Sequence, residues 1–262
     1  MADLSSCAQL PTSALYRFSS DYSRLEPQDG ACGLPILVKV PGSKPACYKA
    51  QDCPAISDLE FLSYGSVNTI YESVYPKDDA ALRKWTADVG GPVEAKRLLN
   101  EVTTAGKLVD DIVTKHDQGL PMPPISSRYA GYCQSLDSLL KEFKQPVTLT
   151  QGLIVNFQLG VFGIIDRIGA YRDYDCALID IKTALSPKAN VKWIEDKVLQ
   201  VAAYELINDG LYTIDTVGLV FFIRDGSVDE YFFDENQIRP YQEKWLNRLA
   251  EVRQIRSLPL AA

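Results

Sequence analysis

Asp180 and Lys182 stand two residues apart in the apolar stretch ALIDIKTA, residues 177–184, which has the composition of a core strand. Side chains alternate between the two faces of a strand, so the carboxylate and the ammonium share one face with Leu178, while Ile179 points the other way. Charged groups are costly to bury unless they have partners. This strand is therefore the first place to look for chemistry.

A second carboxylate precedes it. Asp166 ends GIID on an upstream strand, and the turn AYRDYD lets the two strands pair antiparallel, which predicts that Asp166 lies beside Asp180. Two carboxylates at such a short distance repel each other, and both stay ionised only if a cation lies between them. Oxygen ligands favour Mg²⁺ or Mn²⁺, and the backbone carbonyl of Ile181 offers another.

This combination suits phosphodiester hydrolysis. A bound metal ion polarises the phosphodiester and lowers the pKa of a bound water, while Lys182 orients the attacking water and offsets charge developing on phosphate. The acid-x-Lys pattern is common, however, and occurs four times, at Glu94/Lys96, Glu142/Lys144, Asp180/Lys182 and Glu195/Lys197. We expect the other three in helices, where the two residues do not share a face. The alternative for the strand is a sheet-surface salt bridge.

A helix after the strand adds candidate substrate-binding residues. Gln200 and Tyr204 are four residues apart and hence on one face. The amide could hold a phosphate or a water, and the phenol could support Lys182 or stack on a base; the alternative is two ordinary boundary residues. Further groove candidates are the basic residues Arg167, Lys188, Lys192 and Lys197 and the aromatic residues Tyr171, Tyr174 and Trp193.

The elements that must position these groups follow from periodicity. We expect residues 1–65 to form loops and short strands, such as 14–18 and 34–40, as an elaboration on one main domain, 66–262. Helices are predicted over 77–89, 92–116, near 134–143, over 191–210 and over 238–256, with strands in 147–169, the 163–184 hairpin and 216–234 about an Asp225-Gly226 turn.

Composition narrows the class of protein. Hydrophobic residues at 46% and charged residues at 23% of 262 indicate a globular chain. A net charge of −7 argues against coating nucleic acid by bulk electrostatics, although not against gripping it in one groove. Neither a membrane-spanning run nor a secretion signal is present in the sequence, so we expect a cytoplasmic protein.

The metal-ligating residue types limit the metal. The six cysteines, Cys7, Cys32, Cys47, Cys53, Cys133 and Cys176, form no CxxC pair and are expected to be reduced thiols. With His116 as the single histidine, expected at the surface, a standard zinc site has little to build from.

The sequence resembles the PD-(D/E)xK nuclease superfamily in three motifs that occur in the same order, GIID, IDIKTA and LQVAAY. In its RecB-like branch the corresponding motifs are G-x-x-D, (D/E)-x-K-T and Q-x-x-x-Y. The match falls on Gly163 and Asp166, on Asp180, Lys182 and Thr183, and on Gln200 and Tyr204. Segments 65–85 and 101–113 are similar to a group of exonucleases with mitochondrial, phage and bacterial members. The resemblance implies an α/β core with a central mixed sheet flanked by helices, catalytic Asp166, Asp180 and Lys182, and metal ligands Asp166, Asp180 and Ile181.

Two departures from the family pattern stand out. The family's Gly-Thr-x-x-His, which supplies a metal-facing histidine, corresponds here to a stretch from Gly106 that leads to Asp110, and we take Asp110 as a candidate metal ligand. The alternative is a solvated helix-face acid beside Asp111. The acidic residue that usually precedes the G-x-x-D aspartate by about fifteen positions in the family corresponds to Gln151, and losing a carboxylate could weaken a second metal site.

Together these features predict a Mg²⁺- or Mn²⁺-dependent DNA exonuclease that acts on single-stranded ends in replication or repair, under a helical arch formed by 76–117 that the resemblance implies. The rival is a weakened nuclease-fold protein that binds nucleic acid or a protein partner without cutting. A third hypothesis, a sequence-specific endonuclease, would produce discrete fragments from circular DNA.

Overall fold

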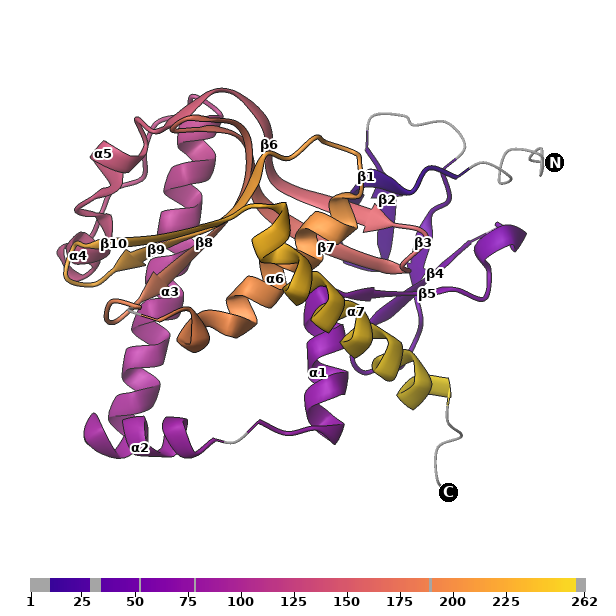
Figure 1. The fold of residues 1–262 in the computed structure, drawn as a ribbon, viewed down its shortest axis with the longest axis horizontal. Helices are drawn as coiled ribbons and strands as arrows, with labels where there is room; N and C mark the ends of the chain where they lie inside the picture. The colour runs from indigo at the N-terminus through magenta and orange to yellow at the C-terminus, as the bar shows by residue number, and fades with distance from the viewer. Residues whose placement is uncertain (1–9, 29–33, 52, 78, 189, 258–262) are drawn as a thin grey trace.

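The computed structural model describes residues 10–28, 34–51, 53–77, 79–188 and 190–257. Within these residues the strands form a ten-stranded mixed sheet with helices packed on it (Figure 1). The expected α/β class with a mixed central sheet and flanking helices is confirmed. None of the helices in the described ranges is both long and apolar enough to cross a membrane.

One end of the sheet carries the predicted hairpins. Strands β7 and β8 pair antiparallel, β8 and β9 pair parallel, and β9 and β10 pair antiparallel about the expected turn at Asp225-Gly226. Every residue of β9 is buried, as expected for a strand covered on both faces. The bounds are Val161–Tyr171 for β7, Tyr174–Ala184 for β8, Thr216–Ile223 for β9 and Val228–Phe233 for β10.

The remaining strands close into a ring. Strand β6 pairs with both β1 and β7, and β5 pairs parallel with β7, so seven strands of the described chain form a closed circuit β7-β5-β4-β3-β2-β1-β6. Their bounds are Ser13–Phe18 (β1), Arg24–Pro27 (β2), Leu37–Lys39 (β3), Cys47–Ala50 (β4), Glu60–Ser63 (β5) and Phe143–Asn156 (β6). Strands from both sides of residue 65 contribute, and the predicted domain boundary there stays a prediction.

The ring has its own core, to which each strand contributes at least one side chain. The core includes Tyr16, Leu25, Leu37, Tyr48, Phe61, Leu153 and Phe162. Closure gives each short strand two neighbours, which removes the free edges that such strands would otherwise expose. Segment 1–65 was expected to be loops and a small sheet, and short turn-rich strands give no signal in sequence that they close on a distant strand such as β6.

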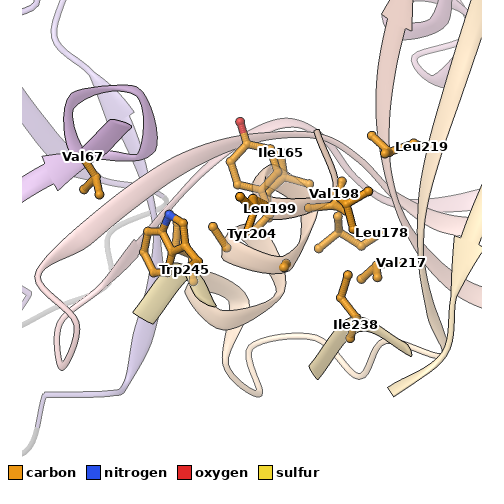
Figure 2. Close-up of a cluster of buried hydrophobic side chains, with 14 of the residues drawn as sticks. Val67, Ile165, Leu178, Val198, Leu199, Tyr204, Val217, Leu219, Ile238 and Trp245 are labelled. Atoms are coloured by element: carbon orange, nitrogen blue, oxygen red, sulfur yellow. The ribbon is translucent and has the colours of Figure 1, made fainter. Parts of the chain in front are cut away.

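Helices cover the two faces of the β7–β10 sheet. The side chain of Leu178 on β8 lies in the core cluster beneath α6 (Glu195–Asn208), and those of Ala177, Ile179 and Ile181 lie in the cluster beneath α3 (Pro92–Asp117). This is the predicted alternation of β8. Figure 2 shows the α6 side, where Tyr204 and Leu199 pack with Trp245 of α7 (Glu235–Ser257).

The structure differs from the predicted helices in two places: one helix was not predicted, and one predicted helix is absent. Residues 64–74, for which no element was predicted, form α1 (Tyr64–Val74), whose N-terminus is capped by Ser63 Oγ accepting from the amide of Ser66. The helix expected near 134–143 is instead two short turns, α4 (Ala130–Cys133) and α5 (Leu136–Leu139), because the chain must already enter β6 at Phe143. The two helices expected over 77–89 and 92–116 are present as α2 (Ala80–Asp88) and α3. The chain also has short 3-10 turns at Pro54–Ile56 (η2), Ser127–Tyr129 (η3) and Val191–Ile194 (η4).

Candidate functional site

The β7–β8 hairpin brings Asp166 and Asp180 together. In its register Arg167 lies opposite Ile179, so Asp166 and Asp180 occupy the next facing positions. The amide of Ile181 donates a 2.8 Å hydrogen bond to Asp166 Oδ2. Because the N–H and C=O of one strand residue point to the same edge, the Ile181 carbonyl also lies on the side of this carboxylate.

Lys182 completes the centre of the site. Its Nζ lies 2.5 Å from Asp180 Oδ2, a buried carboxylate only 1% exposed. The contact is an ion pair, and apart from Lys182 this oxygen has no hydrogen-bond partner among the described residues. Burial acts to lower the pKa of Lys182, yet the surrounding carboxylates, Asp180 first and then Asp166, raise it overall. The side chain is therefore an ammonium at neutral pH.

Helix α3 carries a third carboxylate to the same place. The helix crosses β8 closely, because a Cβ on Gly106 would lie 3.2 Å from Thr183 Oγ1, and the Thr183 hydroxyl donates a 2.9 Å hydrogen bond to the Val102 carbonyl. One turn beyond Gly106, Asp110 is half-buried. Burial raises its pKa to about 6, with Lys182 opposing the shift and Asp180 adding to it.

The three carboxylates interact. The pKa of Asp166 is raised from 3.8 to about 7, first by burial and next by repulsion from Asp180. Attraction to Lys182 lowers it by less, and repulsion from Asp110 adds a smaller increase. One ammonium is thus shared among three acids. The site carries more negative charge than its own cation balances, and protonation or a bound cation would relieve it.

Gln151 lies directly against this cluster. It stands opposite Asp166 on β6, with a positive φ of 47°, and its Nε2 donates to Asp166 Oδ1 at 3.3 Å. The residue that departs from the resembled pattern therefore occupies the position where a further carboxylate would face Asp166. The amide supplies a hydrogen bond where an acid would add repulsion.

Gln200 and Tyr204 form a unit behind the site. Gln200 Nε2 donates to the Tyr204 hydroxyl at 2.7 Å, and the Tyr204 ring is 6% exposed. Its pKa is raised well above the usual value, by burial first and by the charge of Asp180 next. A Cβ on Gly163 would lie 2.8 Å from Tyr204 Cε1, so glycine at this position gives the ring its space. The geometry favours a role in supporting the strand over stacking on a base.

The donors suit a hard cation. Asp180 Oδ2, which apart from Lys182 has no hydrogen-bond partner in the described part of the chain, lies close to Asp166, and both are oxygen ligands of the kind that Mg²⁺ and Mn²⁺ prefer. The described residues contain no group of three or more His, Cys, Asp or Glu placed to hold a metal ion. Asp166, Asp180 and the Ile181 carbonyl thus fit a site whose other ligands come from water or substrate, and the part of Asp110 as a ligand stays a prediction.

Some predicted groove residues turn out to be structural. Arg167 is fully buried in an ion pair with Asp117, Nε to Oδ2 at 3.0 Å, and stacks over Phe143. Tyr171 is also fully buried, so neither side chain can contact a substrate. Asp117 lies fifty residues from Arg167 in sequence, and no local pattern could have identified it as a partner.

The other groove candidates are accessible. Lys192, Lys197 and Tyr174 are exposed, Lys188 is half-buried, and Trp193, in η4 just before α6, is 70% exposed. Among the described cysteines, Cys47, Cys53 and Cys133 are buried and Cys176 is half-buried, while Cys7 and Cys32 lie outside the described residues. His116 is 26% exposed beside Asp117.

Comparison with known proteins gives sequence relatives of one kind. No family model matches the chain. Mitochondrial genome maintenance exonuclease 1 of mouse is 32% identical over 126 residues, which cover 46% of this chain and 37% of the mouse protein. The proteins of the same name from Xenopus tropicalis and human are 29% and 31% identical, over 42% and 36% of their lengths. The matched region therefore spans well under half of each relative.

Proposed function

We propose that this chain is a metal-dependent deoxyribonuclease of the PD-(D/E)xK type that hydrolyses phosphodiester bonds from single-stranded DNA ends. The observation that carries the proposal is the cluster of Asp166, Asp180 and Lys182 on one hairpin, with more buried negative charge than its lysine balances. The relatives are named exonucleases, which supports the same reaction and DNA as the substrate.

The residues divide the work as follows. Asp166, Asp180 and the Ile181 carbonyl would hold Mg²⁺ or Mn²⁺, and the ion supplies polarisation of the phosphodiester and a water of lowered pKa. The carboxylates raise the pKa of Lys182 in the metal-free protein, so there the side chain is an ammonium that donates hydrogen bonds. It orients that water and stabilises charge on the phosphate as the P–O bond breaks.

The rival is a weakened nuclease-fold protein that binds nucleic acid or a protein partner without cutting it. One observation favours it: Gln151 occupies the position where a further carboxylate would face Asp166. The excess of carboxylates over lysine argues against it, because the charges of Asp180 and Asp110 raise the pKa of the buried Asp166, a cost that a bound cation would relieve.

Digestion of end-labelled oligonucleotides separates the two. Linear and circular, single- and double-stranded substrates are incubated with Mn²⁺, Mg²⁺ or EDTA. We expect metal-dependent loss of linear single strands alone, abolished by Asp180→Ala and by Lys182→Ala. Lys96→Ala is the matched control, since Lys96 follows Glu94 in the same acid-x-Lys pattern but is exposed on α3.

The outcomes have distinct meanings. Unchanged activity in Lys182→Ala would refute the site assignment. Absence of cleavage with every metal, in a protein that still binds DNA, would support the rival. Cleavage of circular DNA into discrete fragments would point to an endonuclease.

A further inference from the structure

A cavity of about 580 Å³ adjoins the candidate site, since Lys182 and Thr183 are among its lining residues. One wall comes from α2 and α3, and the other from the end of β8, from η4 and from α6. Figure 1 shows α2 and α3 on one side and α6 on the other. The cavity is lined by Ala81, Leu82, Trp85, Leu99, Val102, Lys182, Thr183, Ala184, Leu185, Ser186, Lys188, Trp193, Ile194, Lys197 and Phe221.

Aromatic and apolar side chains around this cavity are left exposed. Trp193 is 70%, Leu82 55% and Leu99 50% exposed, and Trp85 on α2 is half-buried. Helix α2 has no buried residue at all within its described span, so its apolar side does not serve the core. Large apolar side chains gathered around a hollow mark a binding site more often than scattered surface residues do.

The charge of the cavity has one sign. Three lysines line it, Lys182, Lys188 and Lys197, and no Asp or Glu is among its described lining residues. Lys182 is paired with Asp180. No side-chain ion pair is found for Lys188 or Lys197 in the described part of the chain, although the charges of Asp180 and Asp196 act on Lys197 and Asp229 accepts a hydrogen bond from the Lys188 backbone amide. This is unusual in a chain of net charge −7 and favours an anionic occupant.

We propose that this cavity binds an unpaired nucleobase of the DNA strand held at Lys182, stacked on the indoles of Trp193 and Trp85, with Lys188 and Lys197 on the flanking phosphates. The proposal rests on the proposed function, because it takes the strand at Asp166, Asp180 and Lys182 to be the same strand. Indole rings stack on any base, and lysines bind phosphates without reading sequence. A base inside a duplex has both faces and its pairing edge occupied, so only an unpaired base can enter.

The cavity would thus make the site selective for single strands of any sequence. Its volume is in the range of small-molecule sites and accommodates a nucleotide. Its continuity with the site through Lys182 and Thr183 favours the substrate strand over a side chain of a protein partner.

Binding is tested without metal, in EDTA, so that no cleavage is needed. Tryptophan fluorescence reports it directly, since Trp85 and Trp193 line the cavity and Trp245, the third tryptophan, is fully buried in the core. We expect a thymidine oligonucleotide to quench the emission and an abasic oligonucleotide of the same length to quench little. In the double variant Trp85→Phe/Trp193→Phe, which keeps aromatic rings, binding measured by anisotropy should persist while the quenching disappears.

Affinity variants sharpen the test. Trp193→Ala should bind the thymidine oligonucleotide about 5- to 150-fold more weakly, the range of one lost stacking contact, and the abasic oligonucleotide as the wild type does. Leu120→Ala, a change at a 50% exposed residue that does not line the cavity, is the control and should change neither affinity. Lys188→Ala should reduce the slope of log affinity against log salt by about 0.7, the value for one phosphate contact on a single strand.

Two results would overturn the proposal: equal binding of normal and abasic oligonucleotides by the wild type, or unchanged affinity of Trp193→Ala. Base-dependent binding in a protein that cleaves no DNA with any metal would instead contradict the proposed function and leave the cavity assignment standing. Thermal unfolding of each variant confirms that the fold is retained, as expected for the exposed Trp193.

Discussion

Changing Asp166 to Asn should stabilise the metal-free protein at alkaline pH. The wild-type carboxyl has its pKa raised from 3.8 to about 7, by burial first and by Asp180 next. A folded state with a raised acid pKa binds more protons than the unfolded chain, so the free energy of unfolding falls as pH rises from about 4 to about 7. Asparagine removes the charge and keeps an oxygen that can accept from the Ile181 amide.

The magnitude follows from the two pKa values. Each unit of difference between the folded and the unfolded pKa corresponds to about 1.4 kcal/mol. The rise of the Asp166 pKa from 3.8 to about 7 therefore lowers the free energy of unfolding by about 4 kcal/mol at pH 8, where the carboxyl is ionised in both states. Asp166→Asn should recover an appreciable part of this at pH 8 and almost none at pH 4. Asp110→Asn should act in the same direction but more weakly, because its pKa is raised to about 6 and its side chain is partly solvated.

The assay is urea unfolding at pH 4, 5, 6, 7 and 8 in EDTA. Asp111→Asn, which removes an exposed acid on the same helix as Asp110, is the control, with an expected change of less than about 1 kcal/mol. At each pH the free energy of unfolding of the wild type is subtracted from that of Asp166→Asn, which removes the contributions of the other titrating groups. If the variant is no more stable than the wild type at pH 8, the buried Asp166 carboxylate does not destabilise the fold and the reasoning fails.

Three further changes test the surrounding structure. Gln151→Glu adds a carboxylate beside Asp166, so it should lower metal-free stability and increase the thermal stabilisation by Mn²⁺, and an unchanged Mn²⁺ shift would contradict this. Asp117→Asn leaves Arg167 buried without its partner and should cost about 3–5 kcal/mol in urea unfolding, whereas a loss below about 1 kcal/mol would mean that the pair is dispensable. Gly163→Ala forces a methyl to within 2.8 Å of Tyr204 and should cost about 1–3 kcal/mol, unlike Gly65→Ala, which meets only Ser63 Oγ at 3.9 Å.

How much of this the sequence could predict depended on the range of the contacts. The hairpin that pairs Asp166 with Asp180 was predictable because alternation and a short turn determine which residues face each other. The closed ring was not, since β1 finds β6 more than a hundred residues away and nothing local specifies that partner. Arg167 illustrates the same limit: its charge suggested a surface groove, and only the fold supplies the distant carboxylate that buries it.

Charge is unevenly distributed around Lys182, with acids in the candidate site and lysines in the adjoining cavity. Asp110, Asp166 and Asp180 carry more negative charge than the Lys182 ammonium balances. Lys182 also lines a cavity whose described lining residues include two tryptophans and three lysines and no acid. A surface salt bridge of Asp180 and Lys182 would need neither feature. Charge favours a cation at the carboxylates and a polyanion at the lysines of the cavity, and a strand that contacts both would place a phosphate at Lys182.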